Sequence, residues 1–201
     1  MYCNKHAVQF ITTLTKYASL ELFKKVVTYF YISFEDYFDY AVRNVNLPIA
    51  AYMAETLIRD DGYGLNELHL KCLTATTPEQ LGVVRSASVK KKNFGQSYLI
   101  MPIFCAAINP HLDVFTKVWN LLEDRFVKDE QGSSVIFYAA LNENPAILKY
   151  LLDNNVEFRE SNKIKATPLM WAARTSRLQN VELLINKSFV IHKNFHAEPL
   201  K

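Results

Sequence analysis

Two histidines near the C-terminus, His192 and His196, are the residues whose types and spacing come nearest to a metal site. They are four positions apart, so both imidazoles would lie on one face of a helix and could ligate a metal ion. However, no Glu follows His192, no third ligand lies within sequence reach, and Pro199 is close by. These features favour two polar surface residues near a chain end, and we expect no metal site.

Other residue types that carry chemistry are sparse. The three cysteines, Cys3, Cys72 and Cys105, are odd in number and include no Cys-x-x-Cys pair. This pattern favours a reducing compartment and argues against a disulfide scaffold or a zinc module. The sequence contains no Gly-rich phosphate motif, no Ser nucleophile elbow and no paired-carboxylate pattern. We therefore expect no catalytic residue, no cofactor, no small-molecule substrate and no enzymatic activity.

A basic segment lies between residues 74 and 97. From residue 80 to residue 112 the chain has four Lys or Arg residues and no acidic residue. These cations are Arg85, Lys90, Lys91 and Lys92. The three lysines resemble a weak nuclear-import or nucleic-acid patch, but no aromatic residues are interleaved with them. The formal net charge of the chain is only +3, so nucleic acid is not expected as a partner.

Ser88 is a candidate phosphorylation site within this segment. Arg85 precedes it by three residues, a spacing that basophilic kinases often accept. A phosphate would add a charge of about −1.5 to −2 beside Lys90 and could order or reposition the segment. The alternative is an ordinary solvated surface loop, although a loop of this length is usually either functional or disordered.

The elements that would position any site recur at a fixed spacing. The pair Ala172-Ala173 follows Ala139-Ala140 by 33 residues, and that pair follows Ala106-Ala107 by the same distance. Near the last copy, Thr167 can cap the start of a helix and Pro168 suits its first turn. The positions that repeat in step with the alanines are Pro168, Val135 and Pro102, then Val181, Leu148 and Phe115, then Leu184, Leu151 and Val118. The pattern predicts pairs of short helices that pack on one another.

A 33-residue period with Thr-Pro-Leu and paired alanines resembles the ankyrin repeat. The resemblance implies an all-α fold, an ankyrin-repeat solenoid of stacked helix-turn-helix units with β-turn-like finger loops. His69 occupies the family's motif histidine position, where the ring usually bonds backbone and ties neighbouring turns together. We expect one domain over 1–201, made of a degenerate helical unit at 1–33, divergent repeats at 34–73, a basic insert loop at 74–97, three regular repeats at 98–190 and the start of an incomplete further repeat at 191–201.

The resemblance also indicates which residues bind a partner. In ankyrin proteins the concave side, formed by the first helices and the turn tips, carries the contacts. Transferred to this sequence, the candidates are the residues after each alanine pair and those at the tips, namely Tyr98, Ile108, Asn109, Glu130, Gln131, Leu141, Asn142, Lys163, Ile164, Arg174 and Thr175. An open alternative is that Ile108 and Leu141 pack against the next repeat. Tyr138 and Trp171 are expected to pack between repeats.

We expect a protein-protein interaction module or scaffold that binds a partner protein and has no chemistry of its own. The alternative is a regulatory or targeting domain of a larger signalling or enzymatic protein, with the Ser88 segment as a phosphorylation or nuclear-import switch. No membrane span is expected, because the longest aromatic-rich run, Val26 to Phe34, is too short and is interrupted by Thr28 and Ser33. An intracellular location, in the cytoplasm or the nucleus, fits this composition.

Overall fold

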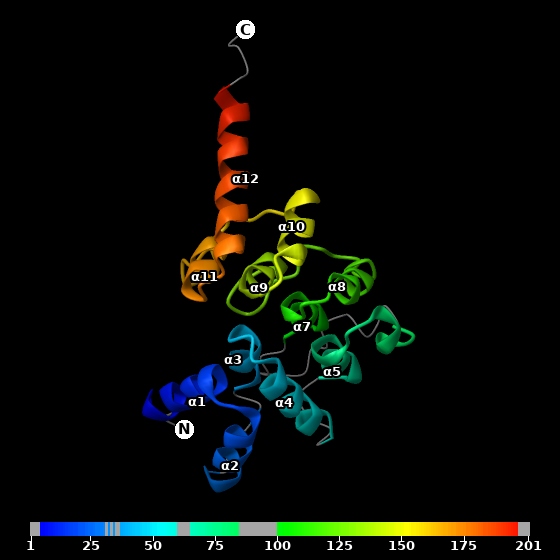
Figure 1. Cartoon of the computed structure of the whole chain (residues 1–201), viewed down its shortest axis with the longest axis vertical. Coiled ribbons are helices and arrows are strands. Elements are labelled where there is room, and N and C mark those ends of the chain that lie inside the picture. The colour runs from blue at the N-terminus through cyan, green and yellow to red at the C-terminus, as the bar shows by residue number, and fades with distance from the viewer. Residues whose placement is uncertain are drawn as a thin grey trace. The chain divides into compact units, whose positions relative to one another are not determined.

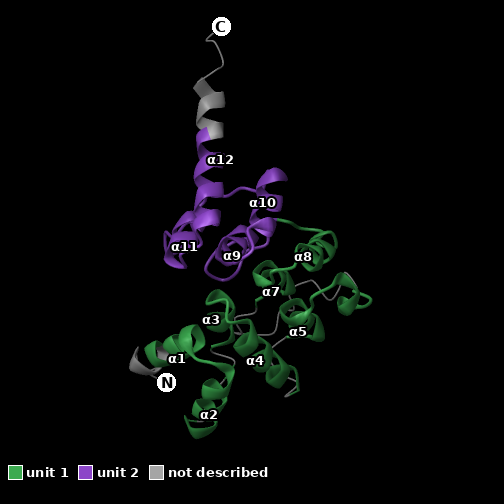
Figure 2. Ribbon diagram, in the orientation of Figure 1, with its two compact units in different colours: residues 1–125 green, residues 126–201 purple. Residues whose placement is uncertain are grey.

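The computed structural model describes residues 5–30, 32, 34, 37–59, 65–84 and 100–196. The described residues form helices joined by turns and one isolated β-bridge between Lys128 and Ser134, which confirms the predicted all-α class. The chain divides into two compact units, residues 1–125 and residues 126–201 (Figure 2). No helix in the described part of the chain is long and apolar enough to cross a membrane.

The first unit begins with two helix pairs, α1 with α2 and α3 with α4 (Figure 1). These helices are α1 (Lys5–Tyr17), α2 (Leu20–Phe30), α3 (Phe38–Arg43) and α4 (Leu47–Arg59). The chain breaks between α1 and α2, where Ser19 Oγ accepts a hydrogen bond from Leu22 N at 3.3 Å and caps α2. Between the pairs, Asn44 Nδ2 donates to Thr15 Oγ1 at 3.0 Å and Asn46 Nδ2 donates to Ala18 O at 3.3 Å.

The first unit continues through α5 (Glu67–Thr74), a 3-10 helix η1 (Pro78–Leu81), α7 (Pro102–Ile108) and α8 (Leu112–Trp119). α5 packs against α4 and α7, and η1 packs against α5 and α8. The short η1 therefore stands where a second helix would pair with α5. The prediction of a loop from residue 74 is wrong at residues 78–81, because Thr77 caps this turn reciprocally with Gln80 and Pro78 suits its start.

The second unit contains two helix pairs, α9 (Val135–Leu141) with α10 (Ala146–Asp153) and α11 (Pro168–Arg174) with α12 (Leu178–His196). α11 packs against α9, and α12 packs against α10 (Figure 1). Every residue of α9 is buried. Tyr138 and Trp171 meet edge-to-face at 5.5 Å between the two pairs, as expected from the sequence.

The ends of the second helices differ from one repeat to the next. After α10 the chain turns at Asn155, whose φ of 56° lies in the left-handed region that Asn tolerates. Ser188 holds the corresponding place in the last repeat, but α12 continues past it to His196. Ser188 Oγ donates to Leu184 O at 2.9 Å within the helix. Residues 191–196 continue α12, and the rest of the predicted further repeat at 191–201 lies outside the described residues, so that further repeat stays a prediction.

Candidate partner-binding surface

A rigid turn precedes α9. The backbone N–H of Gly132 donates to Asp129 O at 2.9 Å, and the Asp129 carboxylate accepts from Ser133 N and from the Tyr138 hydroxyl, both at 2.7 Å. Gly132 has a φ of 76°, which favours glycine. Asp129, Ser133 and Tyr138 are all buried. Residues 129–133 therefore form a finger, and the buried Asp129 carboxylate at its base is hydrogen-bonded within the protein.

A second finger precedes α11 and is joined directly to the first. The backbone N–H of Asn162 donates to Ala166 O at 2.9 Å, and the side-chain Oδ1 of Asn162 accepts from Ala166 N at 2.9 Å. The Asn162 amide donates to Ser133 Oγ at 3.0 Å. At the tips, the backbone N–H of Lys163 donates to Gln131 O at 2.7 Å. The two fingers thus form one continuous structure with a fixed spacing.

The tips of these two fingers carry exposed side chains of mixed chemistry. Glu130 and Lys163 are exposed, Gln131 is half-buried, and Ile164 exposes 65 % of its surface. We name Glu130, Gln131, Lys163 and Ile164 the tip ridge. All four were predicted as partner-binding residues, and the structure brings them together on adjacent turns. Their role in binding stays a prediction.

The prediction that the residues after the first two alanine pairs are exposed is wrong. Ile108, Asn109, Leu141 and Asn142 are each at most 1 % exposed. In the second unit the cause is visible, because α11 packs against α9 and Arg177 Nε donates to Leu141 O at 3.0 Å. Ile108 and Leu141 are instead buried in the protein, in line with the alternative that they pack and do not face solvent.

The two asparagines at these positions have structural partners. Asn109 Nδ2 donates to Cys72 O at 2.9 Å and to Ala75 O at 2.8 Å, and its Oδ1 accepts from His111 N at 2.9 Å. It therefore connects the end of α7 to the end of α5. Asn142 Oδ1 accepts from Asn144 N at 2.9 Å. A buried asparagine side chain is normally hydrogen-bonded, and here the partners are brought to it by the fold.

The residues after the third alanine pair differ. Arg174 is exposed, and its guanidinium lies 6.0 Å from the centre of the Trp171 ring. Thr175 is half-buried and directs its hydroxyl to its own helix, at 3.1 Å from Trp171 O and 3.2 Å from Ala172 O. Arg174 remains a candidate contact for a partner, whereas the Thr175 hydroxyl is already occupied.

The remaining candidates lie outside the residues that the structure describes. They are the tip residue Tyr98, the phosphorylation candidate Ser88 and the basic patch of Arg85, Lys90, Lys91 and Lys92. These hypotheses stay predictions.

His69 has the structural role that its motif position implies. Asn66 N donates to His69 Nδ1 at 3.1 Å, so the ring proton lies on Nε2, which donates to Ile100 O at 2.7 Å. The histidine is 3 % exposed. It caps α5 and ties this turn to the chain before α7, as expected.

Cys72 and Cys105 are buried side chains with no exposed surface. Burial raises the pKa of both thiols, because the thiolate would lose its hydration in the apolar core. Neither cysteine is therefore activated as a nucleophile. Within the described part of the chain, no group of three or more His, Cys, Asp or Glu side chains could hold a metal ion.

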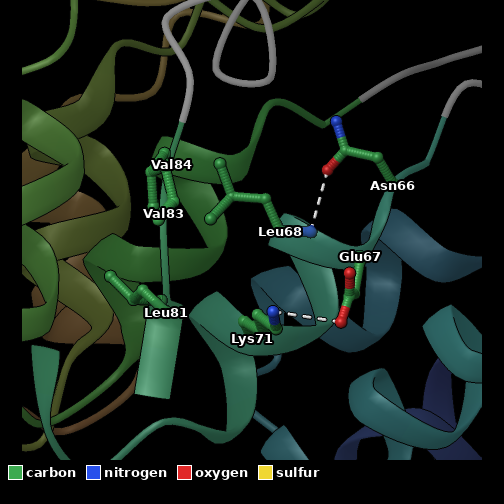
Figure 3. Close-up of a pocket in the computed structure, with 7 residues that line it drawn as sticks. All are labelled: Asn66, Glu67, Leu68, Lys71, Leu81, Val83 and Val84. Carbon is green, nitrogen blue, oxygen red and sulfur yellow. Dashed lines mark hydrogen bonds and ion pairs between the residues drawn. The ribbon is translucent and has the colours of Figure 1, made fainter. Parts of the chain in front are cut away.

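A small pocket lies beside α5 and η1 (Figure 3). Its volume is about 120 Å³, and its lining residues are Asn66, Glu67, Leu68, Lys71, Leu81, Val83 and Val84. Two interactions connect residues of its lining: Lys71 Nζ lies 3.0 Å from Glu67 Oε1, and Asn66 Oδ1 accepts from Leu68 N at 3.0 Å (Figure 3).

A larger open groove of about 460 Å³ runs between α10 and α12. Ala146 and Leu183 contribute apolar surface to it, while Lys149, Gln179 and Glu182 contribute polar groups. Lys149 is paired with Asp153 at 2.7 Å, which holds the pKa of that carboxyl below its usual range through the hydrogen bond from Lys149. The sequence pattern did not identify this groove, because its residues belong to second helices of two different repeats.

The comparisons with known proteins agree with this geometry. Comparison with curated proteins finds no match. Residues 103–195 match the model of a family described as ankyrin repeats, in three copies. This range contains the helix pairs α7 to α12, with their paired alanines and joined fingers. Residues 103–195 are therefore similar to three consecutive ankyrin repeats.

Proposed function

We propose that this protein binds a partner protein through the tip ridge. Ankyrin repeats are generally protein–protein interaction modules, and the family is typically non-enzymatic. The observation that supports this surface is the 2.7 Å hydrogen bond from Lys163 N to Gln131 O, which joins two consecutive tips. A surface that is ordered before binding loses little conformational entropy when a partner docks.

The side chains of the ridge suit a protein partner. Ile164 offers an exposed apolar anchor, and Glu130 and Lys163 place one negative and one positive charge beside it. An apolar centre with a polar rim is the usual anatomy of a protein interface, in which a few anchors supply most of the affinity. Lys128 and Glu160, paired at 2.6 Å, brace the base of the fingers.

The test is affinity capture from cells with the intact chain and with a ridge variant, Glu130→Lys with Lys163→Glu and Ile164→Asp. Captured proteins are compared by quantitative mass spectrometry. A partner that docks on the ridge should be recovered at a level at least about tenfold lower with the variant, because the anchor and both charges are changed together. All three residues are on turn tips, so the variant should keep its fold. Circular dichroism and thermal unfolding check that it does.

A matched control makes the same changes at another exposed site. Glu21→Lys with Lys25→Glu and Leu22→Asp lies on α2, where these three side chains are also exposed. The control variant should capture the partner as the unchanged chain does. The proposal fails if every specifically captured protein is recovered equally by the ridge variant, or if the control variant loses the same proteins.

A further inference from the structure

The outer face of the last helix pair repeats a surface that is buried one repeat earlier. Shifted by 33 residues, Leu169, Met170, Ala173 and Ile185 hold the positions of Ile136, Phe137, Ala140 and Leu152. The four earlier residues are at most 3 % exposed. In contrast, Met170 is 57 % exposed, Leu169 and Ile185 are each 37 % exposed, and Ala173 is also exposed.

The earlier surface is covered because helices pack on it. α11 lies against α9, and α12 lies against α10 (Figure 1). The equivalent face of α11 and α12 therefore has the shape that receives helices, but its residues remain exposed. Phe189, one helical turn after Ile185, is 62 % exposed and extends the same apolar stripe. We name Leu169, Met170, Ala173, Ile185 and Phe189, with the two cations described next, the end face.

At two positions of this face the residue is cationic, whereas the equivalent residue one repeat earlier is uncharged. Lys165 holds the position of Gly132, and Arg174 holds the position of Leu141. Both cations are exposed, and neither belongs to an ion pair identified among the described residues. Glu182 is the only acidic residue in the sequence from 161 to 196, and it lines the groove toward α10. The end face is thus apolar at its centre and basic at its rim.

We infer that the end face binds an amphipathic helix of a partner protein, with Leu-type residues on one side and carboxylates beside them. The apolar side chains of such a helix would cover Met170 and Ile185, and its carboxylates would pair with Arg174 and Lys165. A second copy of this chain fits less well, because a symmetric pairing would bring the cations of both copies to one interface. This inference rests on the proposed function and adds a second contact surface to it.

The test uses the purified full chain and labelled peptides of about 18 residues, long enough for five helical turns. One peptide has Leu at positions i, i+3, i+4 and i+7 with Glu and Ala elsewhere. Its twin has Lys in place of Glu, and a third peptide has the composition of the first in scrambled order. Fluorescence anisotropy measures each Kd. The Glu peptide should bind most tightly, and its binding should weaken as salt rises from about 50 to about 200 mM.

Paired variants separate the apolar and charged contributions. Met170→Ser with Ile185→Ser should weaken binding of the Glu peptide by about tenfold or more, because both anchors are lost. Arg174→Glu with Lys165→Glu should make the chain prefer the Lys peptide. The matched controls, Val83→Ser and Lys25→Glu, change an exposed valine and an exposed lysine elsewhere and should leave each Kd within about twofold.

Four results would overturn the inference. The first is absence of binding by the Glu peptide up to about 1 mM, and the second is equal binding of the Lys or scrambled peptide. The third is a dimer in analytical ultracentrifugation that Met170→Ser abolishes. The fourth is Met170-dependent binding to vesicles of phosphatidylcholine and phosphatidylserine without binding of the peptide. The ridge variant should still bind the Glu peptide, so failure of the tip ridge and failure of the end face give different results.

Discussion

The side chain of Asn180 reaches from one repeat to the carbonyl of Asn142 in the repeat before it, with Nδ2 and O 2.8 Å apart. The same amide donates to Ala140 O at 3.0 Å. Both carbonyls lie at the C-terminal end of α9, where the helix itself has no further donors to offer. Asn180 thus completes the hydrogen bonding of one helix from the second helix of the next pair.

Replacing Asn180 by Ala should destabilise the protein by about 1–3 kcal/mol, because two buried carbonyls lose their donor. Urea unfolding measures this as a lower midpoint with an unchanged m-value. Asn154→Ala is the matched control: its amide bonds only Tyr150 O, within one helix turn and at the surface. A loss below about 0.5 kcal/mol for Asn180→Ala would contradict this account.

Tyr138→Phe should also destabilise the protein, by about 1–3 kcal/mol. The change removes only the hydroxyl that donates to Asp129 Oδ2 at 2.7 Å, and both residues are buried. Thermal unfolding gives the size of the loss. Tyr17→Phe removes the same hydroxyl from a side chain that is 72 % exposed, so an equal loss in that control would show that the buried bond is not the cause.

Val45 has a φ of 56° in the turn between α3 and α4. A β-branched residue is strained in this left-handed region, by roughly 1–2 kcal/mol. Val45→Gly should therefore stabilise the protein by up to about 1 kcal/mol after the entropic cost of glycine. Asn155 has the same φ, but Asn tolerates it, so Asn155→Gly should be close to neutral. If Val45→Gly destabilised the protein, the inferred backbone strain at Val45 would be refuted.

The buried thiols of Cys72 and Cys105 predict a loss of stability in alkali. Burial raises the pKa of both thiols in the folded protein, whereas an exposed thiol has a pKa of about 8.5. Below about pH 8 both states are neutral, and this stability is fully present. As the pH rises further, only the unfolded state ionises, which lowers the free energy of unfolding by about 2 kcal/mol per thiol at pH 10.

Urea unfolding at pH 8, pH 9 and pH 10, as rough steps across this window, tests the thiols. The doubly substituted chain, Cys72→Ala with Cys105→Ala, keeps every other titrating group and is the control. The free energy of unfolding should fall more steeply with pH for the unchanged chain. Parallel pH dependences for the two proteins would rule out the thiols as the cause.

Much of the repeat architecture could be predicted from the sequence, because local chemistry and stacking both leave a pattern. Thr167 caps α11 by accepting from Met170 N at 3.3 Å, as its residue type and position indicate. Tyr138 and Trp171 pack between helix pairs, as large residues beside paired alanines should. The position of His69 also predicts its bond to backbone, here to Ile100 O.

The exposed surface was harder to predict, because exposure depends on the neighbouring repeat. Leu141 and Arg174 occupy equivalent positions, yet one is buried and the other is exposed. Asn109 reads as a surface residue until its carbonyl partners on the preceding helix are known. The length of α12 was missed for a local reason, since Ser188 can satisfy its hydroxyl inside a helix.

The hydrogen bond between the two finger tips is made by backbone atoms alone, from Lys163 N to Gln131 O. The finger bases use buried polar groups such as Asn162 and Ser133. The exposed side chains at the tips take no part in holding this frame. Substitutions of these exposed side chains should therefore leave the finger frame in place, so the chemistry of the tips can vary without a change of fold.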